Sequence, residues 1–79
     1  MRILDQDSDK PLNEVILYLT HAEAVELRDS LNSLLDKLSN DHAHISDENY
    51  QRELTVCIYD IKNLFGFNER SKKLILHDQ

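Results

Sequence analysis

The chain has little of several residue types on which common functional sites depend. Its 79 residues include one cysteine, one glycine and one proline, and no tryptophan. A lone cysteine excludes an internal disulfide and a zinc site made of several cysteines, and it favours a reducing compartment. A single glycine excludes phosphate-binding loops and dinucleotide fingerprints, since these need several glycines at fixed spacing. Nucleotide-binding enzymes of the usual kinds are therefore not expected.

Long hydrophobic runs and clusters of positive charge are also scarce. No stretch approaches the roughly 18 apolar residues of a membrane-spanning helix, and residues 1–10 carry acids and lack the apolar core of a signal peptide. The 15 acidic residues outnumber the 9 basic ones, and the net charge of −6 disfavours nucleic acid as a partner because phosphates would be repelled. We expect a cytoplasmic protein that binds neither membranes nor nucleic acid, with a surface suited to a basic protein partner.

The first half of the chain shows a strand pattern followed by a helix pattern. Residues 14–19, EVILYL, are rich in β-branched and aromatic residues, which is typical of a strand, and residues 2–4 can pair with them. Thr20 and Glu23 form a capping box, and apolar residues then recur at helical spacing over residues 20–38. The face of this helix that we expect to point inward consists of Ala24, Leu27, Leu31, Leu34, Leu35 and Leu38.

The second half of the chain contains two more strand patterns and a final segment of uncertain type. The helix is expected to end at residues 39–41, where Asn40 can adopt a left-handed conformation. Strands are expected at residues 42–46 and 52–60, and in the second the apolar residues at alternate positions should pack on the helix. Asn68 is suited to cap a helix over residues 69–77, although the run KLILH is also compatible with a strand.

The predicted order of elements is therefore β-β-α-β-β, followed by α if the last segment is helical. This order indicates a single α+β domain over residues 1–79, with a small antiparallel or mixed sheet of roughly three to four strands. One main amphipathic helix is expected to pack on one face of that sheet.

An apolar patch is expected on the other face of the sheet. Alternation along the strands places four residues there, which we predict to be the binding surface: Ile16, Tyr18, Cys57 and Tyr59. We expect a second copy of the chain to cover it in a homodimer; the alternatives are a different partner or the C-terminal segment with Phe65, Phe67 and Leu74. Cys57 has no cation or helix N-terminus beside it in the sequence, which indicates a buried, inert thiol rather than a nucleophile.

The segment DHAHISD, residues 41–47, contains two histidines spaced two apart. On a strand His42 and His44 would face the same side and could both reach one metal ion. A zinc site needs at least three protein ligands, however, and no HExxH or CxxC spacing supplies the others. We therefore interpret the pair as the polar edge of a strand.

The N-terminal acids imitate the start of a calcium-binding loop. Asp5, Asp7 and Asp9 have its spacing, but Lys10 and Ile16 stand where the loop needs a glycine and a closing glutamate. The segment is thus predicted to be a solvated acidic turn, and no metal or other cofactor is expected.

The plan of strand, capped helix, HxH strand and long strand in a short acidic chain resembles small bacterial or phage accessory proteins, including toxin-neutralising immunity proteins. Our leading hypothesis is a non-enzymatic interaction protein that binds and masks a protein partner with the acids around its helix and hairpin. Two alternatives stay open. One is a small metal- or ligand-binding enzyme that uses His42 and His44, for which zinc retained on purification would be the sign. The other is a homodimeric structural module without a ligand, which a mass measurement would test.

Overall fold

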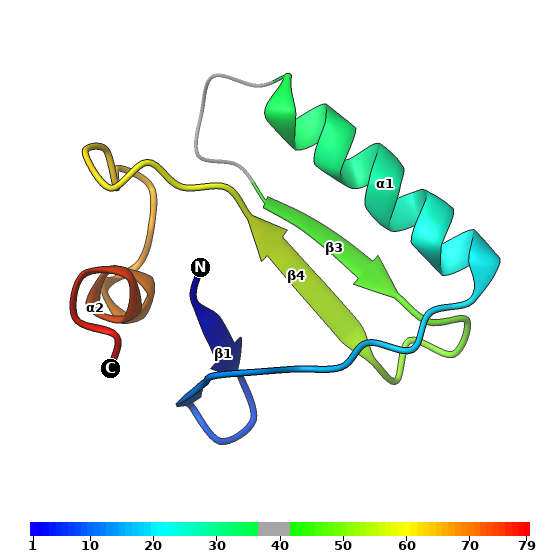
Figure 1. The fold of residues 1–79 in the computed structure, drawn as a ribbon, viewed down its shortest axis with the longest axis horizontal. Helices are drawn as coiled ribbons and strands as arrows, with labels where there is room; N and C mark the ends of the chain where they lie inside the picture. The colour runs from blue at the N-terminus through cyan, green and yellow to red at the C-terminus, as the bar shows by residue number, and fades with distance from the viewer. Residues whose placement is uncertain (37–41) are drawn as a thin grey trace. The chain divides into compact units, whose positions relative to one another are not determined.

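The computed structural model describes residues 1–36 and 42–79, in the order β1, β2, α1, β3, β4 and α2 (Figure 1). The described residues form two helices and four strands, and the strands make two antiparallel two-stranded sheets. The chain is therefore an α+β protein with the expected order of elements, and its four strands are divided between two hairpins. It separates into two compact units: Met1–Leu17 with Ile61–Gln79 (unit 1), and Tyr18–Asp60 (unit 2).

Unit 1 contains the hairpin of β1 (Ile3–Asp5) and β2 (Lys10–Leu12). The Asp5 carboxylate organises its turn, since it accepts hydrogen bonds from the backbone N–H groups of Asp7 and Ser8 and from the Ser8 hydroxyl. Short aspartate side chains favour such turns because they reach the backbone a few residues further along the chain. The predicted acidic turn is confirmed in this form.

The partner of β1 differs from the one expected. The tight turn sets a register in which Ile3 pairs with Leu12, so β1 is paired with residues 10–12. Residues 14–20 have no helix, turn or strand, and the prediction of a strand over residues 14–19 was wrong for this structure. The high β-propensity of the segment is real, but a strand also needs a neighbouring strand to pair with.

The last segment is a helix, α2 (Glu69–His77), which settles the choice between helix and strand. Asn68 is its N-cap, as predicted, and the Asn68 side chain accepts a hydrogen bond from the Ser71 backbone N–H at 2.7 Å. Leu74 and Ile75 are the buried hydrophobic residues of unit 1, each 6% exposed.

The other end of α2 is bound to the start of the chain through Arg2. The Arg2 guanidinium donates hydrogen bonds to the carbonyl oxygens of Leu74 and Ile75 at 3.1 and 3.4 Å. It also lies 3.6 Å from the carboxylate of Asp78, the C-cap residue. Carbonyls of the last helical turn lack partners within the helix, so Arg2 satisfies the Ile75 carbonyl, whereas the Leu74 carbonyl also accepts from the Asp78 backbone N–H at 2.9 Å.

Unit 2 begins with α1 (His21–Leu35), which starts at the predicted capping box. The Thr20 hydroxyl accepts a hydrogen bond from the Glu23 backbone N–H at 3.2 Å, and the Glu23 carboxylate accepts one from the Thr20 N–H at 2.8 Å. Asp36 is the C-cap, so the helix ends before the predicted residue 38. The expected termination at residues 39–41, including Asn40, lies outside the described residues.

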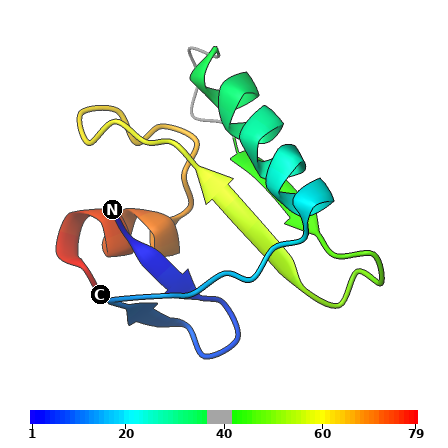
Figure 2. The same cartoon turned by 45° about the vertical axis from the view of Figure 1, so that its right-hand side comes forward.

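The second hairpin joins β3 (His42–Ser46), at the predicted bounds, to β4 (Glu53–Cys57), which is shorter than predicted. Ala43 pairs with Val56, and Ile45 with Leu54, so apolar residues share one face. Figures 1 and 2 both show α1 running beside β3, and the two elements are in contact.

The core of unit 2 is smaller than the leucine pattern of α1 indicates. Leu34 and Ile45 are its buried hydrophobic residues, at 5% and 4% exposed, whereas Leu31 is 36% and Leu35 is 70% exposed. Ala24 is also exposed. A two-stranded sheet covers only a narrow stripe of the helix, so the predicted inward face was too wide. Leu38 lies outside the described residues.

Candidate interaction site

The four residues predicted to share one sheet face do not lie on paired strands. Ile16 and Tyr18 are 74% and 90% exposed, and they lie in the stretch that joins no sheet. Cys57 is the last residue of β4 and Tyr59 follows that strand. A common face of one sheet is therefore not formed, because the strand that would have carried Ile16 and Tyr18 is absent.

Two further expectations about this surface are corrected. Cys57 is exposed rather than buried, and it takes part in no disulfide; it lies at the open end of a hairpin on the face opposite Val56. Phe65 is 88% exposed, so it does not serve as the apolar cover that was expected of it, whereas Leu74 is a buried residue of α2.

The two histidines lie side by side on the polar face of the second hairpin, as the sequence predicts. The His42 and His44 rings meet edge to face, with centroids 4.9 Å apart. His44 Nδ1 lies 2.9 Å from the Thr55 hydroxyl and 2.6 Å from the Glu53 carboxylate. Within residues 1–36 and 42–79, no group of three or more His, Cys, Asp or Glu side chains is placed to hold a metal ion.

The contacts of His44 also bear on nucleophilic catalysis. A hydroxyl–histidine–carboxylate relay needs the hydroxyl on one ring nitrogen and the carboxylate on the other. Thr55 and Glu53 both approach the same nitrogen, Nδ1. This arrangement can orient the imidazole, but it cannot pass a proton from the hydroxyl through the ring to the carboxylate.

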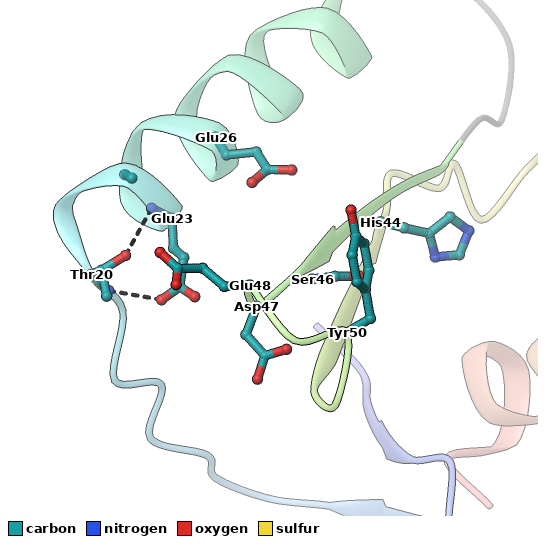
Figure 3. A pocket seen from close by; sticks show the side chains of 9 residues that line it. Thr20, Glu23, Glu26, His44, Ser46, Asp47, Glu48 and Tyr50 are labelled. Atoms are coloured by element: carbon teal, nitrogen blue, oxygen red, sulfur yellow. Dashed lines mark hydrogen bonds between the residues drawn. The ribbon is translucent and has the colours of Figure 1, made fainter.

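A pocket of about 410 Å³ opens between the first turn of α1, the end of β3 and the turn that follows (Figure 3). Four carboxylates surround it and neither lysine nor arginine lines it. In Figure 3, Tyr50 and His44 lie on one side and the carboxylates of the helix and the turn on the other. Its lining residues are Thr20, Ala22, Glu23, Glu26, His44, Ser46, Asp47, Glu48 and Tyr50.

Two of the four carboxylates have structural tasks. Glu23 completes the capping box, and the Asp47 carboxylate accepts hydrogen bonds from the backbone N–H groups of Gln51 and Arg52 at 2.8 and 3.3 Å. In the described part of the chain the carboxylates of Glu26 and Glu48 make no hydrogen bond or ion pair. These two are therefore available to a ligand.

Tyr50 supplies an aromatic wall from an unusual backbone position. Its φ is 55°, in the left-handed region that non-glycine residues rarely adopt. Its side chain is directed outward and the residue is 86% exposed. The backbone N–H donates to the Asp47 carbonyl oxygen at 3.1 Å, so the turn fixes the backbone of Tyr50 beside the pocket and leaves the ring exposed.

The pocket was foreseen only in part. The sequence indicates acids around the helix and the hairpin, but Asp47 and Glu48 follow a strand while Glu23 and Glu26 begin a helix. Their proximity depends on how α1 packs on β3, which a single sequence does not encode locally. The sequence did indicate that acids stand at a helix start, after Thr20, and in a turn, after residue 46, but not that these two places meet.

Neither helix in the described ranges is long and apolar enough to cross a membrane.

Comparison with known proteins found no relatives. No protein-family model matches the chain, and no significant match was found among curated proteins or solved structures.

Proposed function

We propose that this chain is a non-enzymatic interaction protein that binds and masks a basic segment of a partner protein. The observation that carries the proposal is the pocket of unit 2, in which carboxylates and one aromatic ring surround a space without a lysine or arginine. A lysine or arginine side chain of a partner fits this chemistry, because Glu26 and Glu48 have no other partner within the described residues. Masking of this kind is what the resemblance to small accessory and inhibitor proteins implies.

The expected strength of binding follows from the exposure of the pocket to solvent. Each exposed ion pair contributes about 0.2–1 kcal/mol, and a cation on the face of Tyr50 adds about 0.5–1 kcal/mol. One side chain in the pocket is thus a weak anchor, so a tight complex needs flanking contacts. The net charge of −6 accelerates encounter with a basic partner and makes binding weaker at high salt.

Two features favour binding over catalysis. The contacts of His44 do not form a proton relay, since both polar neighbours approach Nδ1. The pocket is open, so it would not exclude water from a reaction. We propose the cytoplasm as the compartment, because a chain with a single cysteine cannot form the internal disulfides that are typical of oxidising compartments.

Calorimetric titration with a short arginine-containing peptide tests the proposal. Glu26→Gln combined with Glu48→Gln should weaken binding about two- to thirtyfold, which corresponds to about 0.4–2 kcal/mol for two exposed ion pairs, and added salt should weaken the binding of the parent protein. The matched control is Asp7→Asn with Asp36→Asn, which removes the same charge from exposed acids outside the pocket.

The control decides between a site and a general acidic surface. Binding that falls equally in the two double variants, or that is unchanged in both, would contradict the pocket as the binding site. Circular dichroism should show that each variant keeps the helix content of the parent.

A further inference from the structure

An unpaired apolar segment leads from β2 to α1. Five consecutive apolar residues, Val15, Ile16, Leu17, Tyr18 and Leu19, are 53%, 74%, 48%, 90% and 39% exposed. Residues of these types have high β-propensity, yet the segment belongs to neither sheet. A long apolar stretch with unpaired backbone is a template for pairing with another chain.

The backbone of the segment is open to such pairing. Among the described residues, no hydrogen bond involves the backbone N–H or carbonyl groups of Val15, Leu17 or Leu19. These three residues alternate along the chain, so in a strand their N–H and C=O groups would point to the same edge.

We propose that residues 14–20 of two copies pair as antiparallel β-strands about a twofold axis at Leu17, which makes the chain a homodimer. The unstructured stretch is bounded by β2, which ends at Leu12, and by α1, which begins at His21. Leu17 is the middle residue of 14–20. A register centred further along would draw helical residues into the ladder, and one centred earlier would leave Leu19 without a strand partner.

The capping box fixes which pairs share hydrogen bonds. In an antiparallel ladder, alternate residue pairs exchange two hydrogen bonds and the pairs between them exchange none. The Thr20 N–H already donates to the Glu23 carboxylate, so Thr20 belongs to a pair without hydrogen bonds. Counting back by alternate pairs, Leu17 then bonds to Leu17 of the partner subunit, and Val15 to Leu19 of the partner subunit.

The side chains suit this register. Ile16 lies opposite Tyr18 of the partner subunit, and pairs of a β-branched and an aromatic residue are among those that stabilise sheets. Glu14 lies opposite Thr20 and not opposite a second Glu14, so no like charges face each other. A twofold dimer is also the commonest symmetry for a self-complementary surface.

The available area indicates a weak dimer. Taking about 150–220 Å² for a fully exposed side chain of this size, the exposed fractions of the five residues amount to roughly 550 Å² in each copy. Two copies expose roughly 1,100 Å², and a two-stranded ladder buries only part of this because its side chains project from both faces, so the buried area lies below the range of about 1,000–1,200 Å² for specific interfaces. We therefore expect a dimer that dissociates on dilution.

Light scattering over a range of micromolar to millimolar concentrations tests the dimer. The parent protein should shift from monomer to dimer mass, and Tyr18→Glu should raise the dissociation constant about two- to thirtyfold, since two cross-strand pairs are lost. The matched control is Tyr50→Glu, which changes a tyrosine of similar exposure, 86%, outside the segment. A monomer mass at every concentration, or a dimer that both variants weaken equally, would overturn the proposal.

Cysteine cross-linking tests the register. In a Cys57→Ser background, Leu17→Cys should form a covalent dimer under mild oxidation, because a residue on the twofold axis meets itself within about 5.5 Å between Cα atoms. Val15→Cys and Leu19→Cys should each cross-link poorly alone but readily when the two proteins are mixed. Equal cross-linking by all three single variants would show unspecific contact and overturn the register. Tyr18→Glu should leave peptide binding at the acidic pocket unchanged, so a failure of either proposal can be told from a failure of the other.

Discussion

Arg70 of α2 holds Asp9 of the β1–β2 turn through two contacts. Its Nε lies 2.7 Å from the Asp9 carboxylate, and its Nη2 donates to the Asp9 carbonyl oxygen at 3.0 Å. Asp9 has a positive φ of 59°, a conformation that aspartate tolerates better than most residues. One guanidinium thus fixes both the side chain and the backbone of the residue that completes the turn.

Arg70→Lys should destabilise the protein although it keeps the charge. A lysine has one compact ammonium group and cannot make both contacts of the planar guanidinium. The side chain of Asp9 is 65% exposed, so the ion pair is screened, and we expect a loss of about 1 kcal/mol in the free energy of unfolding. Urea denaturation measures it, with Lys73→Ala as the control at an exposed position of the same helix. A loss of equal size in the control would mean that the contacts to Asp9 contribute nothing.

Truncation of leucines in α1 should separate its buried stripe from its exposed one. Leu34→Ala should cost about 2–4 kcal/mol, as buried leucines do, because Leu34 is 5% exposed. Leu35→Ala should stay within about 0.5 kcal/mol of the parent, because Leu35 is 70% exposed. Leu31, at 36% exposed, should fall between them, below the cost that the sequence pattern alone implies. Similar losses for Leu34 and Leu35 in thermal unfolding would show that the helix face is assigned wrongly.

Local signals in the sequence predicted most elements of the fold. The capping box at Thr20, the cap at Asn68 and the strand over residues 42–46 all depend on neighbours within a few residues. The strand expected over residues 14–19 needed β1 as its pairing partner. Because of the tight turn at Asp5, β1 pairs with residues 10–12 instead. Which strands pair depends on the tertiary structure, and the β-propensity of a single segment does not determine it.

The candidate site, like the fold, could be predicted from the sequence only where it depends on neighbouring residues. The shared polar face of His42 and His44 followed from alternation along one strand. The acidic pocket did not, because Glu26 and Glu48 come from elements that meet only through packing. The apolar patch predicted around Tyr18 is not a sheet face, because residues 14–19 do not form a strand. The exposure of this segment is what led us to propose it as a dimer interface.

Stability should depend on pH through Asp5. Hydrogen bonds from the Ser8 hydroxyl, and from the backbone of Asp7 and Ser8, hold the pKa of the Asp5 carboxyl below its ordinary value of 3.8. A carboxyl with a lowered pKa in the folded state stabilises the protein above its unfolded pKa, and this contribution is lost as the pH falls through the folded value. Asp5→Asn should therefore reduce the melting temperature near neutral pH and have a smaller effect at a pH well below 3.8. A difference between variant and parent that is the same at both pH values would contradict this account.

Removal of metal should leave the protein unchanged. His42 and His44 share one face, but the described residues bring no third ligand into place, and His44 Nδ1 already contacts Glu53 and Thr55. Treatment with a chelator should not alter the melting temperature, and His42→Ala with His44→Ala should change it little. A large increase on adding zinc would favour the metal-binding alternative, because a ligand that binds only the folded state stabilises it by mass action.

Tyr50→Gly should make the protein more stable and a poorer binder. Tyr50 has a φ of 55°, which costs a non-glycine residue roughly 1–2 kcal/mol, whereas glycine adopts it readily. Because the residue is 86% exposed, little packing is lost with the ring. After the larger backbone entropy of glycine in the unfolded chain is subtracted, a gain of about 0.5–1 kcal/mol is expected.

The control for this change is Tyr18→Gly, which removes an equally exposed ring where no positive φ is present, and it should not stabilise the monomer. Chemical denaturation of dilute protein measures both variants. If Tyr50→Gly is the less stable of the two, the ring contributes packing that its exposure hides. If it is more stable and still binds the arginine peptide as the parent does, the ring is no part of the pocket. Stability gained together with affinity lost would mean that the strained turn is retained because it presents the ring to a partner.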